Sequence, residues 1–249
     1  MNTSASDAQR LAAGSVLVVG VGGLGCPAAL ALARAGIGRL VLADDDVVDV
    51  TNLHRQILFA DQDVGDDKLD AAERALRRDG FRGEVELVRS RFLPHNARTL
   101  SRSVDVVVEG ADNFATKFLA ADAGCLEGRP VVHGSAVRFR ATAWAVGPGG
   151  RPCYRCLFED VPFGETQANC AEAGVMGPVT GLAGALMAEL ALRVVCGRPA
   201  FGRVLTYDGL ADRLRSVDVQ PRKDCSLCGS VPSIFDIEET RYTGAICAA

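Results

Sequence analysis

Two Cys-x-x-Cys pairs in the second half of the chain carry the most specific chemical signal in the sequence. The pairs are Cys153/Cys156 and Cys225/Cys228. Each pair can present two thiolates to one ion, and four thiolates form a closed tetrahedral set, which is the ligand set of a structural zinc site. One pair alone would also fit a redox dithiol, but two matched pairs favour zinc. Because the pairs lie far apart in the chain, the metal would join distant segments.

A glycine-rich loop near the start of the chain is typical of nucleotide binding. Residues 20–25 read Gly-Val-Gly-Gly-Leu-Gly, with an apolar run before them and a helical pattern after them. Glycines let the backbone approach a phosphate, and the start of the helix offers amide donors and the positive end of its dipole. Asp44 ends the next predicted strand, where an acid commonly binds ribose hydroxyls. This pattern suits an NAD dehydrogenase as well as an ATP enzyme.

Charged residues after Asp44 favour a triphosphate over the pyrophosphate of NAD. Arg55 can fork across two phosphate oxygens, and Lys68 supplies a mobile point charge. Asp112 follows a later predicted strand, at the carboxyl end where a carboxylate partner of Mg²⁺ would lie. Any one of these residues could instead belong to a solvated charged surface. Together they predict a Mg-ATP site.

The predicted elements bring these residues to one edge of a sheet. Strand and helix patterns alternate in the first half, which indicates a Rossmann-like α/β fold, a mainly parallel sheet with helices on both faces. We expect strands at 15–20, 38–44, 84–89, 105–109 and 130–134, and helices at 24–35 and 66–79. The second half predicts an exposed strand at 138–146, an apolar helix at 174–196 and closing antiparallel strands at 203–207 and 213–219. Residues 1–249 therefore form one predicted domain, with a short arm (1–14) and a tail (230–249).

Composition argues against several classes of function. The 249 residues are 48% hydrophobic, and their net charge of −4 offers no general attraction to nucleic acid or to an anionic membrane. The N-terminus has no apolar signal region, and no segment looks long and uncharged enough to span a bilayer. Nine cysteines without a signal peptide indicate the reducing cytoplasm. Most of the unpaired ones are expected to be small core residues, among Cys26, Cys125, Cys170, Cys196 and Cys247.

Seven motifs, in order, resemble the MoeB/ThiF/HesA family of ubiquitin-activating-enzyme-like adenylyltransferases. They are GVGGLG, DDDVVDVTNLHRQ, VGDDK, ADN, CYRC, CAEAGVMGP and CSLCG. The resemblance implies a homodimer in which Mg-ATP adenylates the C-terminal glycine carboxylate of a small β-grasp sulfur-carrier protein ending in Gly-Gly. Sulfur then replaces AMP to give a thiocarboxylate. The sulfur would come from a separate donor of the rhodanese or cysteine desulfurase type.

The resemblance also implies roles for individual residues. Gly22 and Gly23 resemble the glycines that approach the phosphates, and Asp44 resembles the ribose ligand. The rest of the implied nucleotide site comprises Thr51, Asn52, Leu53, His54, Arg55, Lys68, Asp112 and Asn113. Of these, Arg55 and Lys68 would hold phosphates and Asp112 would hold magnesium. The implied catalytic set is Arg55, Lys68, Asp112 and Cys170.

Cys170 is the cysteine expected to take part in covalent chemistry. It precedes the long predicted helix and follows a stretch, 160–168, suited to cover an active site. A helix N-terminus lowers the pKa of a thiol by stabilising the thiolate. The resemblance implies that this cysteine accepts sulfur or forms a disulfide-linked intermediate with the carrier. The alternative is a cysteine with no role in the reaction.

One feature of the family has no counterpart in the sequence. Members usually carry an N-terminal arm whose arginine reaches the ATP of the partner subunit, whereas Arg10 is the sole basic residue among the first fourteen. We therefore expect that arm to be absent. The residues after Cys228 resemble the linker that leads to a rhodanese domain in some members.

Three other functions stay open at this point. An NAD-dependent oxidoreductase would leave Lys68 and Asp112 without a task, and His133 is expected to be a packed residue rather than a proton shuttle. A related dehydratase that activates a tRNA-bound carboxylate would need a basic face, which the net charge does not favour. A catalytically degenerate scaffold would fit the missing arm.

Overall fold

One mixed sheet of eight strands organises the molecule. The computed structural model describes residues 5–160, 174–199 and 201–242. The strand order is β3-β2-β1-β4-β5-β6-β7-β8, with β3 to β5 parallel and β5 to β8 antiparallel. The strands are β1 (Ser15–Val19), β2 (Arg39–Ala43), β3 (Glu84–Val88), β4 (Val106–Glu109), β5 (Val131–Val137), β6 (Arg140–Val146), β7 (Arg203–Asp208) and β8 (Arg213–Asp218). This confirms the predicted fold class.

The central strands are buried on both faces because their side chains alternate between two cores. In β1, Val16 and Val18 belong to one apolar cluster, whereas Leu17 and Val19 belong to the other. Such continuous apolar runs are typical of parallel strands covered on both sides by helices. The alternation fixes the register of β1 against β2 and β4, since a shift by one residue would exchange the two faces.

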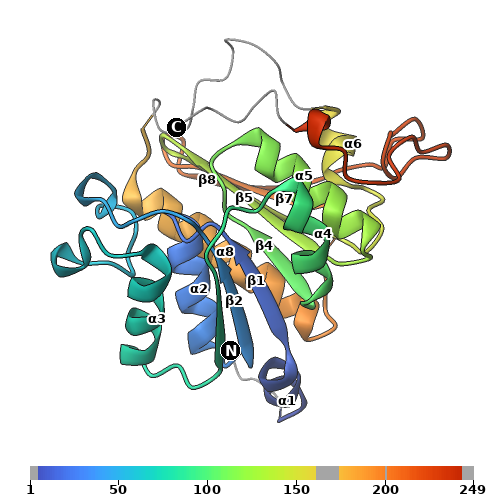
Figure 1. The fold of residues 1–249 in the computed structure, drawn as a ribbon. Coiled ribbons are helices and arrows are strands. Elements are labelled where there is room, and N and C mark those ends of the chain that lie inside the picture. Colours follow the sequence, from blue (N-terminus) through green and yellow to red (C-terminus); the bar gives the residue numbers. More distant parts are fainter. Residues whose placement is uncertain (1–4, 161–173, 200, 243–249) are drawn as a thin grey trace.

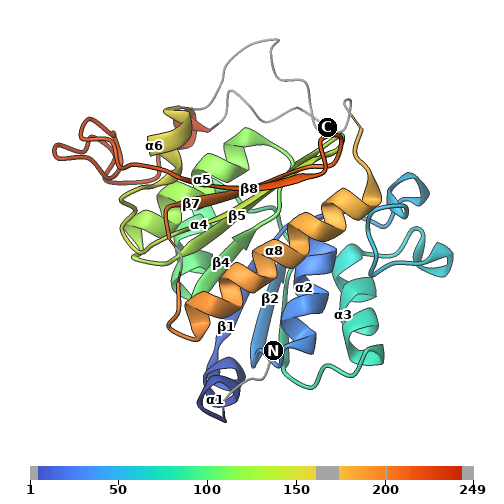
Figure 2. The ribbon, with the colours of Figure 1, turned by 180° about the vertical axis from the view of Figure 1, so that it is seen from behind.

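Helices cover the two faces as separate layers (Figures 1 and 2). One face carries α2 (Gly25–Arg34), α3 (Lys68–Arg78) and the long α8 (Gly177–Val195). The opposite face carries α4 (Pro94–Arg102), α5 (Phe114–Leu126) and the short α6 (Tyr154–Phe158). Asp67 and Asn113 are the N-caps of α3 and α5, and their side chains accept backbone N–H groups of the first turn. Short 3-10 turns are η1 (Val50–Asn52), η2 (Asp61–Asp63) and η3 (Glu239–Arg241).

Helix α8 corrects one expectation from the sequence. Among the described residues, it is the one helix long and apolar enough to cross a membrane by length and composition. It packs instead against α2 and the middle of the sheet, where Ala183, Met187 and Ala191 are fully buried. An apolar helix in a protein core passes the same compositional test.

The order of the strands decides where a ligand can bind. From β1 the chain crosses to β2 on one side, and β4 lies on the other side of β1. A crevice therefore opens beyond the carboxyl ends of β1 and β4, the usual binding position in such sheets. Helix α1 (Ala5–Ala13) lies at the opposite end of the strands (Figure 1). Its Arg10 donates to the Cys196 carbonyl oxygen after α8, and so does not reach the crevice of its own chain.

Candidate active site

The glycine loop after β1 is shaped by two backbone requirements. Gly20 has a φ of +82°, in the left-handed region that favours glycine. Gly25 starts α2 so close to the loop that an added Cβ would lie 1.9 Å from the carbonyl oxygen of Gly20. The loop therefore turns tightly and directs the start of α2 toward the crevice, as phosphate binding requires.

Asp44 fixes this loop from the end of β2. Its Oδ2 accepts the Val21 N–H at 2.6 Å, and its Oδ1 accepts the Asp46 N–H at 2.9 Å. Burial raises the pKa of Asp44, against the opposing charge of Lys68. The predicted ribose ligand thus also has a structural task, since it joins the glycine loop to the acidic loop after β2.

The segment around η1 presents a cation to the glycine loop. Arg55 donates from Nη2 to Asn52 Oδ1 at 2.5 Å, and its side chain lies 3.2 Å from the position of an added Cβ on Gly23. His54 Nδ1 lies 2.9 Å from the Thr51 carbonyl oxygen. These contacts place the methylene carbons of Arg55 against Gly23 and its guanidinium against Asn52 at the cavity wall, and a guanidinium can bind two phosphate oxygens at once.

The start of α8 packs against the segment around η1. An added Cβ on Gly177 would lie 2.2 Å from the carbonyl oxygen of His54, so the two backbones touch. Thr180, one turn further along α8, packs near Gly23. The GVMGP motif therefore serves the site by close packing, which explains its glycine at position 177.

Lys68 is the second cation of the crevice. It is the first residue of α3, and its Nζ pairs with Asp46 Oδ2 at 2.7 Å. The Lys68 side chain is 6% exposed and that of Asp46 is 67% exposed. An ammonium held by one solvated carboxylate can exchange that partner for a phosphate at modest cost.

The turn after β4 brings Asp112 to the other side of the crevice. Asp112 is exposed, and within the described residues its carboxylate makes no hydrogen bond or ion pair. Asn113 caps α5 by accepting the Thr116 N–H at 2.9 Å. A free carboxylate on a fixed turn is a hard oxygen ligand of the kind Mg²⁺ prefers, so the residues present fit that ion.

These segments enclose a cavity of about 740 Å³, within the ordinary range for small-molecule sites. Ten of the predicted nucleotide-site residues line it: Gly22, Gly23, Asp44, Thr51, Asn52, His54, Arg55, Lys68, Asp112 and Asn113. Leu53 is the exception, because its apolar side chain packs against the core that contains α2 and α8. Cys170, the stretch 161–168 and Cys247 lie outside the described residues.

Several residues of the cavity wall were not identified from the sequence. Lys117 lines the cavity from α5 and forms a buried ion pair with Glu109. Gln56 also lines it, is 3% exposed, and has an Oε1 without a hydrogen-bond partner among the described residues. Lys117 and Glu109 could have been suspected from the sequence, because they lie on either side of the ADN turn. His133, predicted to be packed, is 2% exposed and contacts Glu109.

The four predicted zinc ligands form one buried cluster. The Sγ atoms of Cys153 and Cys156 lie 3.9 Å apart, and Cys153–Cys225 and Cys156–Cys228 are each 3.4 Å apart. All four lie within 4.8 Å of one another. A tetrahedral zinc with Zn–S bonds of about 2.3 Å requires sulfurs about 3.8 Å apart. The cluster therefore fits zinc, and it joins the start of α6 to the chain after β8.

Other cysteines behave as core residues. Burial raises the pKa of Cys26 to about 12, although it follows the nucleotide loop. Cys125 on α5 is likewise raised to about 12 by burial and by the neighbouring thiols. Neither is a reactive thiolate at neutral pH.

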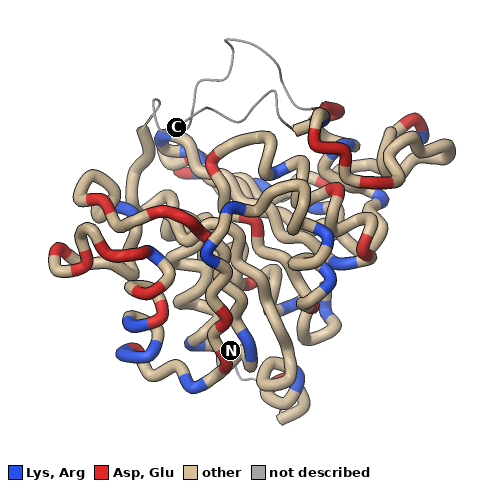
Figure 3. The backbone as a smooth tube through the Cα atoms, viewed as in Figure 1, with Lys and Arg blue, Asp and Glu red and all other residues tan. Residues whose placement is uncertain are grey.

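Acidic and basic residues are interspersed along the backbone in the view of Figure 3. Asp44, Asp45 and Asp46 place carboxylate oxygens within 4.8 Å of one another at the cavity. Lys68 pairs with Asp46 of this acidic group, and Arg55 lines the same cavity, so the crevice holds both signs of charge. Such a mixture suits a metal-bound anion better than a bare polyanion.

The chain is similar in sequence to known adenylyltransferases and activating enzymes. The adenylyltransferase and sulfurtransferase MOCS3 of Bos taurus is 43% identical over 233 residues, which are 92% of this chain and 51% of the relative. The SAMP-activating enzyme E1 of Haloferax volcanii is 40% identical over 233 residues, 92% of this chain and 86% of the relative. The chain thus spans about half the length of the MOCS3 proteins it matches.

Solved structures share the fold. MccB of E. coli, in a crystal structure with ATP, superposes with a TM-score of 0.77 at 23% identity, covering 90% of this chain and 69% of that one. A family model described as the ThiF family matches residues 1–227. The chain belongs to the ThiF family.

Proposed function

We propose that this protein is an adenylyltransferase that uses Mg-ATP to activate the C-terminal glycine carboxylate of a ubiquitin-like sulfur-carrier protein. The observation that carries the proposal is that Arg55, Lys68 and Asp112 line one cavity together with the glycine loop. Two cations and a free carboxylate suit a metal-bound triphosphate. An NAD site would leave Lys68 and Asp112 without a task.

The proposed reaction is a displacement at the α-phosphorus of ATP. An oxygen of the carrier carboxylate forms a new P–O bond, the bond to the β-phosphate bridging oxygen breaks, and pyrophosphate leaves with the electron pair. Because two anions must meet, the enzyme contributes mainly charge neutralisation and alignment. Arg55 and Lys68 would neutralise phosphate oxygens, and the glycine loop would supply backbone amides.

Magnesium would bind at Asp112, with Asn113 beside it. When bound, the ion would neutralise charge on the phosphates. Asp44 is the proposed ribose ligand, and its bonds to the Val21 and Asp46 amides keep it oriented. Thr51, Asn52 and His54 complete the proposed nucleotide segment.

The proposed substrate rests on the relatives. The names of the MOCS3 and SAMP-activating relatives describe adenylyl transfer, sulfur transfer and carrier activation. We assign to this chain the adenylation of a β-grasp carrier ending in Gly-Gly, with sulfur supplied by a separate donor in the reducing cytoplasm. The proposed role of Cys170, acceptance of sulfur or of the carrier, belongs to that later step.

Zinc in this proposal is a structural ion held by Cys153, Cys156, Cys225 and Cys228. Gly150 supports the site, because an added Cβ there would lie 2.9 Å from the Cβ atoms of Cys153 and Cys228. The binding energy of such an ion contributes directly to folding.

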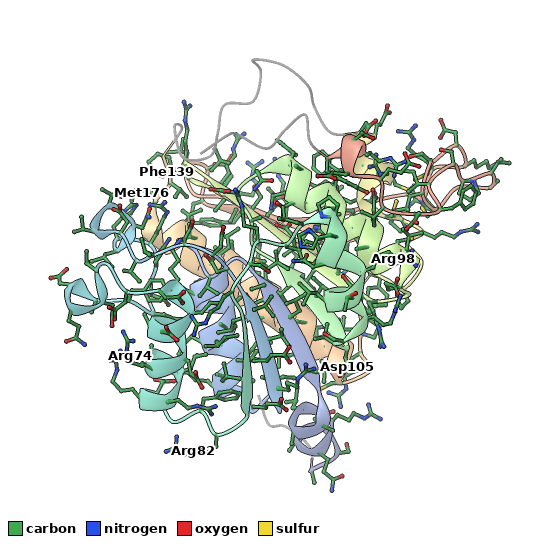
Figure 4. All side chains as sticks on the ribbon, in the orientation of Figure 1. Arg74, Arg82, Arg98, Asp105, Phe139 and Met176 are labelled. Carbon is green, nitrogen blue, oxygen red and sulfur yellow. The ribbon has the colours of Figure 1, made fainter. Side chains whose placement is uncertain are left out.

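A homodimer is part of the proposal. Apolar side chains stand exposed on the loops beside the cavity: Val47, Val50, Ile57, Val64 and Met176 are 44% to 62% exposed. Met176 is labelled in Figure 4 and directly precedes Gly177, which touches the His54 backbone. A second copy would cover this surface, since such patches usually mark an interface.

The direct test is intact-mass spectrometry of a carrier after incubation with the protein and Mg-ATP. We expect an AMP adduct on the carrier, and no adduct on a carrier that lacks its final glycine. An adduct on tRNA-linked substrates instead would favour the related dehydratase. Tight NAD binding without ATP binding would contradict the proposal.

A further inference from the structure

A buried charge cluster lies directly behind the Asp112 turn. Glu109 ends β4 and is fully buried, and its Oε2 lies 3.0 Å from Lys117 Nζ and 3.2 Å from His133 Nδ1. Lys117 Nζ also donates to the Gly134 carbonyl oxygen at 2.6 Å. Burial alone would raise the pKa of Glu109, but the charge of Lys117 and the hydrogen bond from His133 outweigh it, so the pKa is lowered. The cluster therefore holds a buried ion pair.

The cluster reaches the turn through one backbone hydrogen bond. Glu109 Oε1 accepts the Ala111 N–H at 2.7 Å, and the same oxygen lies 3.3 Å from Lys117 Nζ. On the other side of the turn, Asn113 caps α5. Asp112 thus lies between two anchored residues, although its own carboxylate has no partner among the described residues.

Burying such a pair is expensive in desolvation, and well-packed apolar residues of similar size are often as stable. Stability alone therefore does not account for this pair. The hydrogen bond from the Ala111 amide to Glu109 suggests a further role, because it holds the residue next to Asp112, the proposed magnesium ligand. Residues that hold a metal ligand in place typically change metal affinity 10- to 100-fold when they are removed.

We propose that Glu109, held by Lys117, is a positioning residue that sets the Asp112 carboxylate for Mg-ATP through the Ala111 amide. The inference rests on the proposed function, because it assumes that Asp112 serves the metal-nucleotide. Glu109 does not touch substrate in this view. Its contribution would appear in the affinity for Mg-ATP and not in the affinity for AMP.

Two double variants separate the hydrogen bond from the charges. Glu109→Leu/Lys117→Met removes both buried charges and the acceptor of the Ala111 N–H. Glu109→Gln/Lys117→Met removes the charges but keeps an amide oxygen at that acceptor position. Measured by calorimetry, we expect the first variant to bind Mg-ATP about tenfold more weakly than wild type and the second to remain within about threefold. AMP affinity should change less than threefold in both.

A second buried pair provides a matched control. Asp122 and Arg155 are 0% and 1% exposed, their closest atoms are 2.8 Å apart, and Asp122 lies on α5, as Lys117 does. Asp122→Asn/Arg155→Met neutralises this pair in the same way and keeps an acceptor for the Tyr242 hydroxyl. It should lower the melting temperature while leaving the ratio of Mg-ATP to AMP affinity at the wild-type value.

The outcomes distinguish this inference from the proposed function. If wild type fails to bind Mg-ATP, or Asp112→Asn binds it normally, the proposed function is wrong. If Asp112→Asn weakens Mg-ATP binding but the Glu109→Leu variant does not, only the positioning role is wrong. Equal losses for Mg-ATP and AMP would also overturn it. Should the leucine variant not fold, hydrogen exchange of wild type decides, because an unprotected Ala111 amide would contradict the bond on which the inference depends.

Discussion

Replacement of Lys68 by alanine should weaken the binding of ATP much more than the binding of AMP. The Lys68 ammonium pairs with Asp46 at 2.7 Å, and Asp46 is largely solvated. Alanine leaves Asp46 in solvent and Asp44 still bound to the Val21 and Asp46 backbone N–H groups, so the fold should lose little stability. A hydrogen bond between charged groups contributes about 1.5–3 kcal/mol, so ATP affinity should fall about 10- to 150-fold. AMP, which lacks the β- and γ-phosphates, should lose less than about threefold on the same scale.

Calorimetric titration of Mg-ATP and AMP measures both constants on one preparation. Arg74→Ala is the matched control, because Arg74 lies on the same helix, pairs with Asp63 and Asp66, and projects outward from α3 (Figure 4). This control should leave both affinities within about twofold. Equal weakening of ATP and AMP in Lys68→Ala would refute the reasoning, because Lys68 would then serve the adenosine or the fold.

Three further predictions concern zinc, pH and the cysteine chemistry. Purified protein should contain about one zinc per chain by elemental analysis, and Cys228→Ser should lose the metal and melt at a lower temperature; zinc-free, fully stable protein would contradict the site. Hydrogen bonds from Arg102 and Arg98 lower the pKa of Glu127 from 4.5 to about 2, so its contribution is present above pH 4.5 and is lost as pH falls toward 2. That shift corresponds to about 3 kcal/mol, reduced by solvent around the exposed arginines to about 1 kcal/mol. In urea unfolding, the stability difference between wild type and Glu127→Gln should therefore shrink by about 0.5 kcal/mol between pH 6 and pH 3, roughly half of the full contribution, and a constant difference would speak against it. Cys170→Ser should retain carrier adenylation and impair thiocarboxylate formation, whereas unchanged thiocarboxylate yield would make Cys170 a bystander.

The fold could be predicted from the sequence because its local patterns agree with one another. The apolar runs of β1, β2 and β4 and the helical pattern of α3 matched the structure to within a few residues. β5 extends to Val137, three residues beyond its predicted end, because it pairs with β6 along its whole length. Such pairing is a tertiary effect that a local pattern does not carry. The expectation that no segment could span a bilayer was wrong for α8, whose composition passes that test, and only its packing against α2 and the sheet shows it as a core helix.

The sequence could name candidate site residues where a residue's own type carries the chemistry. Arg55, Lys68 and Asp112 were named because guanidinium, ammonium and carboxylate groups bind phosphates and metals, and the structure brings all three to one cavity. Leu53 was assigned to the site by its position in a motif, but its apolar side chain packs against the core and does not line the cavity. Glu109 was not predicted, because the role proposed for it depends on a hydrogen bond to the Ala111 amide that forms only in the folded chain.

The most direct test of the central claim is ATP–pyrophosphate exchange with and without a β-grasp carrier protein ending in Gly-Gly. Reversible adenylation returns labelled pyrophosphate to ATP only when a carboxylate has been activated. We expect exchange with the intact carrier, loss of exchange when its final glycine is deleted, and a fall of about 100-fold or more in Asp112→Ala. Absence of exchange with every Gly-Gly carrier, in protein that binds Mg-ATP, would contradict the account.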